Sequence, residues 1–159
     1  MSRIPSRARP LTVGVVGLGA IGRRVCQALD AGLPGVTLAG ATARSRDRAE
    51  AFLKSLGTPA PFLTLDDLVA ASEVVVEAST QAHLQEIAPK ALGAGRDLIV
   101  LSCGALLGRS DWVVLAEQNG CRILVPSGAI AGLDAVKGGA VGPITSVTME
   151  SRKAPAGWA

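Results

Sequence analysis

The sequence predicts a layered α/β protein in which helices cover both faces of a parallel sheet. Short apolar runs alternate along the chain with segments whose apolar residues recur at helical spacing. Hydrophobic residues make up 48% of the sequence and aromatic residues only 3%, which predicts a core of Val, Leu, Ile and Ala. With 159 residues, the chain is long enough for one domain with a proper core and too short for two ordinary ones.

The first part of the chain predicts two strand and helix pairs. A strand over 11–16 precedes a helix over 20–31, and a strand over 36–43 precedes a helix that opens at Asp47. Glu50 stands three residues after Asp47, which is the spacing of a reciprocal N-terminal cap. The first helix is expected to turn four apolar residues toward the core, namely Ile21, Val25, Ala28 and Leu29.

The middle of the chain continues the alternation. Prolines limit 61–63 to an edge strand or a loop, and Thr64 is predicted to cap a short helix. Pro89 is expected to kink or restart the next helix, and Ser110 to cap the one after it. The apolar runs between these helices predict the remaining strands, over 73–77, 97–101 and 121–125.

The last part of the chain suggests a second domain. Residues 144–150, ITSVTME, alternate like a half-exposed strand, and the sequence stops soon after them. The organisation we expect is a flexible basic arm over 1–10, a nucleotide-binding domain over 11–143 and, over 144–159, the start of a truncated second domain.

The charge distribution argues against a nucleic-acid partner. The net charge of +3 resides in the arm, whose Arg3, Arg7 and Arg9 leave 13 basic against 13 acidic residues in the remainder. No apolar run approaches the roughly 20 residues of a membrane span, and the arm has no apolar core of a secretory signal. We therefore expect neither a nucleic acid nor a membrane as partner.

The cysteines and the histidine do not form a metal or disulfide pattern. Cys26, Cys103 and Cys121 are an odd set without C-x-x-C spacing, which suits a reducing cytoplasm. Cys103 without a paired base is expected to fill space rather than act as a nucleophile. His83 is the single histidine, and we expect it to be partly exposed or at the edge of the core.

The stretch VGVVGLGAIGRR carries the most specific functional signal. Three glycines in G-x-G-x-x-G spacing follow an apolar strand and open an amphipathic helix, as in Rossmann-type doubly wound sheets that bind dinucleotides. Gly17 permits the tight turn, Gly19 leaves room for a pyrophosphate, and Gly22 lets the helix approach the strand. The free amides of Ala20 and Ile21 would point at the anion. The alternative is a purely structural turn.

The residues after the second strand favour NADP over NAD. An NAD site usually has a carboxylate about 20 residues after the glycine turn, where it binds the ribose 2′-hydroxyl. Here Arg44, Ser45 and Arg46 occupy that place, and their cationic and hydroxyl groups suit a 2′-phosphate. The alternative is that these arginines only line a solvated loop.

Loops after the later strands are expected to face the nicotinamide half, because ligands of open parallel sheets lie beyond the carboxyl ends of the strands. They read EASTQ, SCGALLG and PSGAIAGLDA. Their candidate cofactor residues are Ala78, Ser79, Ser102 and Gly104. Glu77 ends an apolar strand, where it holds either a neighbouring loop or the ribose. Trp112 is expected in the core.

Four motifs, VGVVGLGAIG, VVVEAST, DLIVLSCGAL and ILVPSGAIAGLDA, together resemble the amino-terminal half of the L-aspartate dehydrogenase family over about residues 11–155. The resemblance implies a Rossmann domain followed by a mixed α/β catalytic domain. It implies oxidative deamination of L-aspartate, at its CH–NH₂ group, through iminosuccinate to oxaloacetate and ammonia with NAD or NADP.

The resemblance also implies roles for single residues. Ala105 would lie against the cofactor, and Ser127, Gly128 and Ala129 would line the junction with the amino-acid substrate. The family's catalytic histidine belongs to the second domain, so this chain would hold no catalytic residue and would bind without turnover. A homo-oligomer is expected for the full-length enzyme.

Other interpretations remain open. A homoserine dehydrogenase or a dihydrodipicolinate-reductase-like enzyme would share the glycine turn, although PSGAIAGLDA favours the aspartate enzyme. A free-standing module that senses NADP and acts through a partner protein is the alternative outside enzymes.

Overall fold

The computed structural model describes residues 9–127, 133–148 and 150, with the backbone alone described at 133–135. The chain divides into two units, Met1–Pro126 and Ser127–Ala159. The first unit carries the sheet and the candidate site. In the second unit, the described residues form one short helix, α6 (Leu133–Gly139).

The first unit contains a parallel five-stranded sheet in the order β2-β1-β3-β4-β5. From β1 the chain passes first to β2 on one side and later to β3 on the other, so the direction of strand addition reverses at β1. The strands are β1 (Leu11–Val16), β2 (Val36–Thr42), β3 (Val74–Glu77), β4 (Asp97–Val100) and β5 (Ile123–Leu124).

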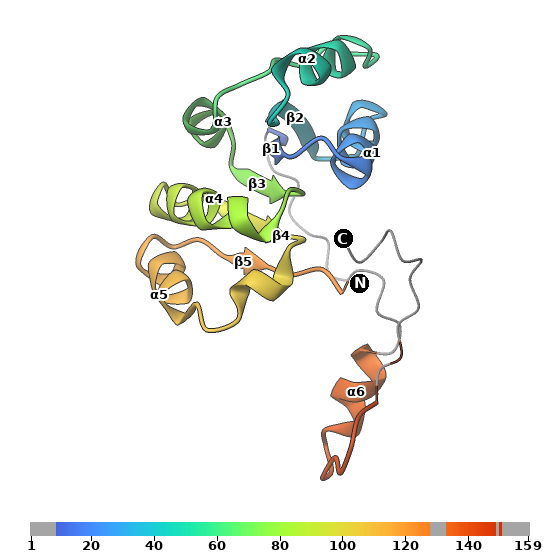
Figure 1. Ribbon diagram of the computed structural model, residues 1–159, viewed down its shortest axis with the longest axis vertical. Coiled ribbons are helices and arrows are strands. Elements are labelled where there is room, and N and C mark those ends of the chain that lie inside the picture. Colours follow the sequence, from blue (N-terminus) through green and yellow to red (C-terminus); the bar gives the residue numbers. More distant parts are fainter. Residues whose placement is uncertain (1–8, 128–132, 149, 151–159) are drawn as a thin grey trace. The chain divides into compact units, whose positions relative to one another are not determined.

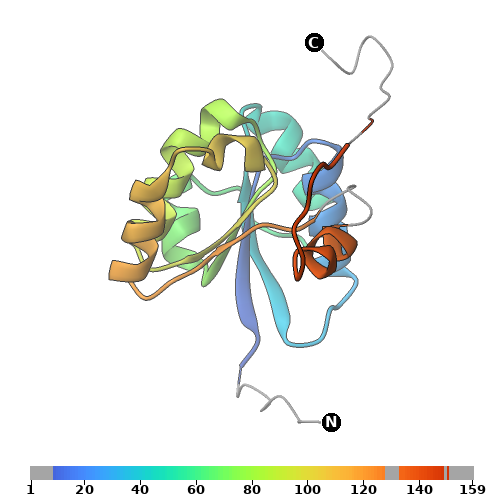
Figure 2. The ribbon, with the colours of Figure 1, turned by 90° about the horizontal axis from the view of Figure 1, so that it is seen from below.

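Helices cover both faces of this sheet. One face packs against α1 and α2 through a cluster that includes Val15, Cys26 and Leu53, and the other packs against α3, α4 and α5 around Leu84 and Trp112. Figures 1 and 2 show α1 on one side of the strands and α4 and α5 on the other. The helices are α1 (Ala20–Asp30), α2 (Arg46–Lys54), α3 (Leu65–Ala71), α4 (Gln81–Gly93) and α5 (Ser110–Gln118), with a 3₁₀ turn, η1 (Cys103–Leu106), before α5.

The Rossmann-type doubly wound fold predicted from the sequence is confirmed. The predicted strand over 61–63 is reduced to a single bridge between Phe62 and Ala41, as the prolines before Phe62 suggested. Thr64 caps α3 as predicted, because its side-chain oxygen accepts a hydrogen bond from the Asp67 amide at 3.2 Å.

The buried face of α1 differs from the predicted stripe. Ile21 and Ala28 are exposed, whereas Gly22, Cys26 and Leu29 are buried. The close approach of Gly22 to the backbone of Gly17 turns that position of the helix toward the sheet. The buried face is therefore shifted along the helical sequence by about one residue.

Two predicted helix caps are wrong, and the restart expected at Pro89 does not occur. The reciprocal cap at the start of α2 does not form: Ser45 occupies the N-cap position, and Glu50 binds Arg46 instead. Pro89 does not restart the helix: α4 runs from Gln81 to Gly93, with buried residues on both sides of the proline, and a kink stays a prediction. Ser110 does not cap α5, because the helix begins at Ser110 itself and Arg109 occupies the N-cap position.

The strand expected over 144–150 is absent from residues 144–148, which the structure describes without regular secondary structure. An alternating sequence forms a strand only where a partner strand completes its hydrogen bonds. The unit that carries the sheet ends at Pro126, and the domain boundaries expected at residues 10 and 143 stay predictions.

Candidate functional site

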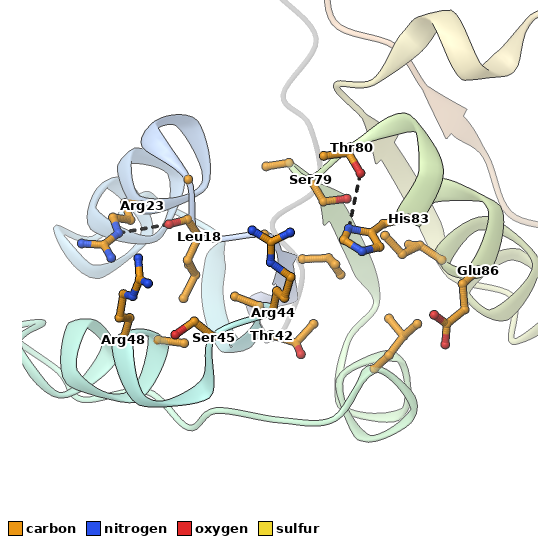
Figure 3. A pocket seen from close by; sticks show the side chains of 18 residues that line it. Leu18, Arg23, Thr42, Arg44, Ser45, Arg48, Ser79, Thr80, His83 and Glu86 are labelled. Atoms are coloured by element: carbon orange, nitrogen blue, oxygen red, sulfur yellow. Dashed lines mark hydrogen bonds between the residues drawn. The ribbon is translucent and has the colours of Figure 1, made fainter. Parts of the chain in front are cut away.

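A cavity of about 620 Å³ lies at the carboxyl ends of β1, β2 and β3 (Figure 3). Its walls come from the turn after β1, the start of α2, the turn after β3 and the first turns of α4. This is the place where strand addition reverses at β1, and ligands of open α/β sheets bind at such switch points.

The glycine turn has the geometry that its spacing predicts. Gly17 has a φ of 96°, and a Cβ at this position would collide with the carbonyl oxygen of Ala78. A Cβ on Gly22 would collide with the carbonyl oxygen of Gly17. At Gly19 a Cβ would meet nothing within 4 Å, and this residue lines the cavity. Gly17 and Gly22 are therefore required by close packing, and Gly19 leaves an open approach to the backbone.

The mouth of α1 is suited to an anion. Gly19 is the N-cap residue and supplies no side-chain acceptor, and the first turn holds no acidic residue. The first intrahelical hydrogen bond runs from the Arg23 amide to the Gly19 carbonyl, so the amides before it have no partner within the helix. Ala20 and Ile21 are exposed and are not among the residues that line the cavity, so the binding of an anion by their backbone amides stays a prediction.

Three arginines from different elements line the cavity, and we call Arg23, Arg44 and Arg48 the arginine corner (Figure 3). The Arg23 Nε donates to the Leu18 carbonyl at 3.0 Å, and its guanidinium carbon lies 4.9 Å from the Phe52 ring centroid. Arg44 and Arg48 are exposed, and neither makes a hydrogen bond or ion pair with a described residue. Cations without partners are thus available beside the mouth of α1.

Arg46 does not join Arg44 and Ser45 in the cavity, although its sequence position predicts that it would. Its Nε donates to the Glu50 carboxylate at 2.7 Å, and its guanidinium carbon lies 5.3 Å from the Phe62 ring centroid. The hydrogen bond from Arg46 lowers the pKa of Glu50. Arg46 does not line the cavity, whereas its sequence neighbour Ser45 does.

Sequence reasoning missed Arg23 and Arg48. Arg23 follows Gly19 by four residues, which places it one helical turn beyond the glycine, and this spacing could have indicated it. Arg48 follows Arg44 by four residues. The pairing of Arg46 with Glu50 could also have been read from their i,i+4 spacing.

Glu77 is fully buried and joins two loops. Its carboxylate accepts hydrogen bonds from the backbone amide and the hydroxyl of Ser79, both at 2.8 Å. It also accepts from the amide of Ser102 at 2.9 Å and from the hydroxyl of Ser102 at 3.0 Å. Of the two roles left open for Glu77, the structure therefore supports holding a neighbouring loop.

The remaining predicted cofactor residues divide into two groups. Ala78 and Ser79 line the cavity. Ser102, Gly104 and Ala105 follow β4 and do not line it, although Ser102 is connected to Ser79 through Glu77. Gly104 lies close to the Gln81 side chain, and Ala105 is half-buried against the core.

His83 lines the cavity and is exposed, with its Nδ1 3.4 Å from the Thr80 hydroxyl. Cys103 is exposed in η1. Ser127 is exposed in the second unit, and the predicted substrate residues Gly128 and Ala129 lie outside the described residues.

The described residues contain no group of three or more His, Cys, Asp or Glu side chains that could hold a metal ion. No helix among them has the length and apolar character needed to cross a bilayer.

The sequence matches known dehydrogenases. A family model described as "Homoserine dehydrogenase, NAD binding domain" matches residues 17–126. The L-aspartate dehydrogenase of Bradyrhizobium diazoefficiens is 42% identical over 143 residues, which cover 90% of this chain and 51% of that protein. The L-aspartate dehydrogenase of Methanosarcina barkeri is 37% identical over 153 residues, which cover 94% of this chain and 56% of that protein. The chain thus spans about half the length of these relatives.

The fold is shared with solved dehydrogenase structures. A homoserine dehydrogenase from Thiobacillus denitrificans superposes with a TM-score of 0.63 at 19% sequence identity. The match covers 74% of this chain and 29% of that chain. At this identity the likeness concerns the fold alone.

Proposed function

Because the chain belongs to the family described as the NAD-binding domain of homoserine dehydrogenase, we propose that it is the dinucleotide-binding part of an L-aspartate dehydrogenase. Its relatives at 42% and 37% identity confirm the resemblance to the L-aspartate dehydrogenases that its motifs indicated. The observation that carries the proposal is the open mouth of α1, where Gly17 and Gly22 are fixed by close packing and unpartnered arginines stand beside the approach.

The residues of the cavity fit a nicotinamide dinucleotide. The amides at the start of α1 would hold the diphosphate, because a helix N-terminus with open access attracts anions. The adenosine end would lie toward β2 and the arginine corner, and the nicotinamide end toward the loops after β3 and β4, since the glycine turn stands between them. When bound, the nicotinamide ring would accept hydride from the substrate Cα.

We propose that NADP is preferred over NAD. Arg44 and Arg48 have no partner among the described residues, so both can pair with a 2′-phosphate without breaking an existing contact. Ser45, which also lines the cavity, adds a hydroxyl donor. A carboxylate that would repel the phosphate is absent from the described residues that line this cavity near β2.

Titration with NADPH and NADH, followed by nicotinamide fluorescence, tests the cofactor assignment. We expect saturable binding of both nucleotides and a lower Kd for NADPH. Equal affinities would overturn the preference for NADP, and no binding of either nucleotide at millimolar concentration would overturn the proposed function.

L-Aspartate is the substrate we propose, because the relatives that match nine-tenths of the chain are named for it. L-Homoserine is a second candidate, favoured by the family model over residues 17–126. Assaying the product of the whole gene for NADP-dependent oxidation of each amino acid separates the two. Ammonia release with L-aspartate supports the first, and oxidation of L-homoserine alone supports the second.

We expect this chain by itself to bind nucleotide without turnover. The resemblance implies that the family's catalytic histidine belongs to a second domain, and His83 is exposed beside the cavity with its Nδ1 3.4 Å from the Thr80 hydroxyl. We also propose a cytoplasmic location, consistent with three free cysteines, and a homo-oligomeric complete enzyme.

A further inference from the structure

Glu77 is a carboxylate where an apolar side chain would be expected. It ends β3, whose sequence is VVVE, and its exposed fraction is 0%. Burying a carboxylate is costly unless hydrogen bonds compensate for the lost water. Four hydrogen bonds from Ser79 and Ser102 provide that compensation, and they connect the carboxylate to two loops.

Each carboxylate oxygen accepts a backbone amide from a different loop. Oε1 accepts from the Ser79 amide at 2.8 Å, and Oε2 accepts from the Ser102 amide at 2.9 Å. β3 and β4 are neighbouring parallel strands, with Glu77 opposite Val100, so both loops leave the sheet at the same edge. The carboxylate therefore bridges two loops that are 23 positions apart in sequence, from Ser79 to Ser102.

The loop that Glu77 holds also supports the glycine turn. The Ala78 amide donates to the Val16 carbonyl at 2.8 Å, at the end of β1. A Cβ placed on Gly17 would lie 3.0 Å from the Ser79 Cα, which shows how closely the two turns pack. A displacement of the loop after β3 would consequently change the shape of the cavity wall opposite the arginine corner.

We propose that Glu77 is a positioning residue that fixes the two loops on which the nicotinamide half of the dinucleotide rests, without touching the nucleotide. This inference depends on the proposed function, because it assigns the β3 and β4 loops to the nicotinamide end. The adenosine half is held at the other end of the cavity, by the arginine corner and the start of α2, where Glu77 makes no contact.

Glutamine is the decisive substitution. It keeps the size and shape of the side chain but replaces one oxygen with an NH₂ group, which only donates. Because both oxygens of Glu77 accept a backbone amide, the NH₂ group faces another donor in either orientation. One loop must then release its hydrogen bond, and the buried amide left without an acceptor favours movement of that loop.

The test compares Glu77→Gln with Glu117→Gln, an equivalent change at an exposed position of α5. The nucleotide probe is NADPH or NADH, whichever the parent chain binds more tightly. The half-nucleotide probe is adenosine 2′,5′-bisphosphate for NADPH or ADP for NADH. We expect Glu77→Gln to weaken dinucleotide binding at least tenfold and half-nucleotide binding less than twofold, with Glu117→Gln changing neither.

Hydrogen exchange supplies a second measurement in the same variant. Exchange at the amides of Ser79 or Ser102 should accelerate, while exchange within β1 stays at the parent rate. Equal losses for the dinucleotide and its half, or no loss for either, would overturn the inference while leaving the proposed function intact. A parent chain that binds neither probe would overturn both.

Ser102→Ala keeps the inference testable if Glu77→Gln does not fold. The Ser102 side chain does not line the cavity, and its hydroxyl donates to Glu77 at 3.0 Å. We expect about a threefold loss of dinucleotide affinity, weaker than for Glu77→Gln because the backbone amides still bind the carboxylate. Unchanged dinucleotide affinity in this variant would contradict the positioning role.

Discussion

The arginine corner gives the sharpest prediction, because Arg44 and Arg46 are close in sequence and differ in what they contact. Arg44→Ala and Arg48→Ala each remove a cation that lines the cavity and has no partner among the described residues. Arg46→Ala removes a cation bound to Glu50 outside the cavity and serves as the matched control. All three changes delete the same side chain from the same short segment.

The magnitude follows from the exposure of the arginines. Two unit charges about 4 Å apart interact by about 1 kcal/mol in water and about 4 kcal/mol at an effective dielectric constant near 20. Arg44 and Arg48 are exposed, so the lower part of this range applies. We expect each substitution to cost about 1 to 2 kcal/mol of NADPH binding, which corresponds to about a five- to thirtyfold higher Kd.

Fluorescence titration at fixed ionic strength measures the change. The Kd for NADPH should rise in Arg44→Ala and Arg48→Ala, while the Kd for NADH changes less than twofold, because NADH lacks the 2′-phosphate. Arg46→Ala should leave both constants at the parent values. Equal losses for NADH and NADPH, or a loss in Arg46→Ala as large as in Arg44→Ala, would refute the assignment of the 2′-phosphate to this corner.

Three further predictions concern stability. Gly17→Ala should lower the melting temperature and abolish nucleotide binding, because the φ of 96° at this position disfavours a side chain and the new Cβ would collide with the Ala78 carbonyl. A melting temperature equal to that of the parent chain would contradict this prediction. Burial raises the pKa of Cys26 from 9.0 to about 11, so the thiol ionises at lower pH in the unfolded chain than in the folded one. The free energy of unfolding should therefore fall by up to about 3 kcal/mol as pH rises from 9 to 11, and urea unfolding should find a smaller fall in Cys26→Ala. The hydrogen bond from Arg122 lowers the pKa of Asp97, so this pair stabilises the fold above the ordinary carboxyl pKa and the benefit should disappear on acidification; an Arg122→Ala chain with the parent's acid-unfolding midpoint would contradict the assignment.

Local sequence signals predicted the features that depend on backbone geometry. The glycine turn was predictable because Gly17 and Gly22 are each required by close packing, Gly22 against Gly17 within the motif and Gly17 against Ala78 after the neighbouring strand β3. The cap at Thr64 was predictable because donor and acceptor lie three residues apart.

Side-chain partners set by tertiary packing were harder to predict. Arg46 and Arg23 each lie over an aromatic ring from another segment, Phe62 and Phe52 respectively. The role of Glu77 in holding a loop could not be assigned from the sequence, because Ser102 comes beside it only through the pairing of β3 with β4. Alternation over 144–150 predicted a strand without showing whether a partner strand was present, and residues 144–148 form none.

The central claim is that a dinucleotide binds with its diphosphate at the mouth of α1. Amide chemical shifts of the isotopically labelled chain, recorded by NMR during titration with NADPH, test it directly. We predict that the largest shifts fall on residues 17–23 and 44–48, with smaller shifts at Ser79. Saturable binding with the largest shifts elsewhere on the sheet, or no shifts at millimolar NADPH, would contradict the claim.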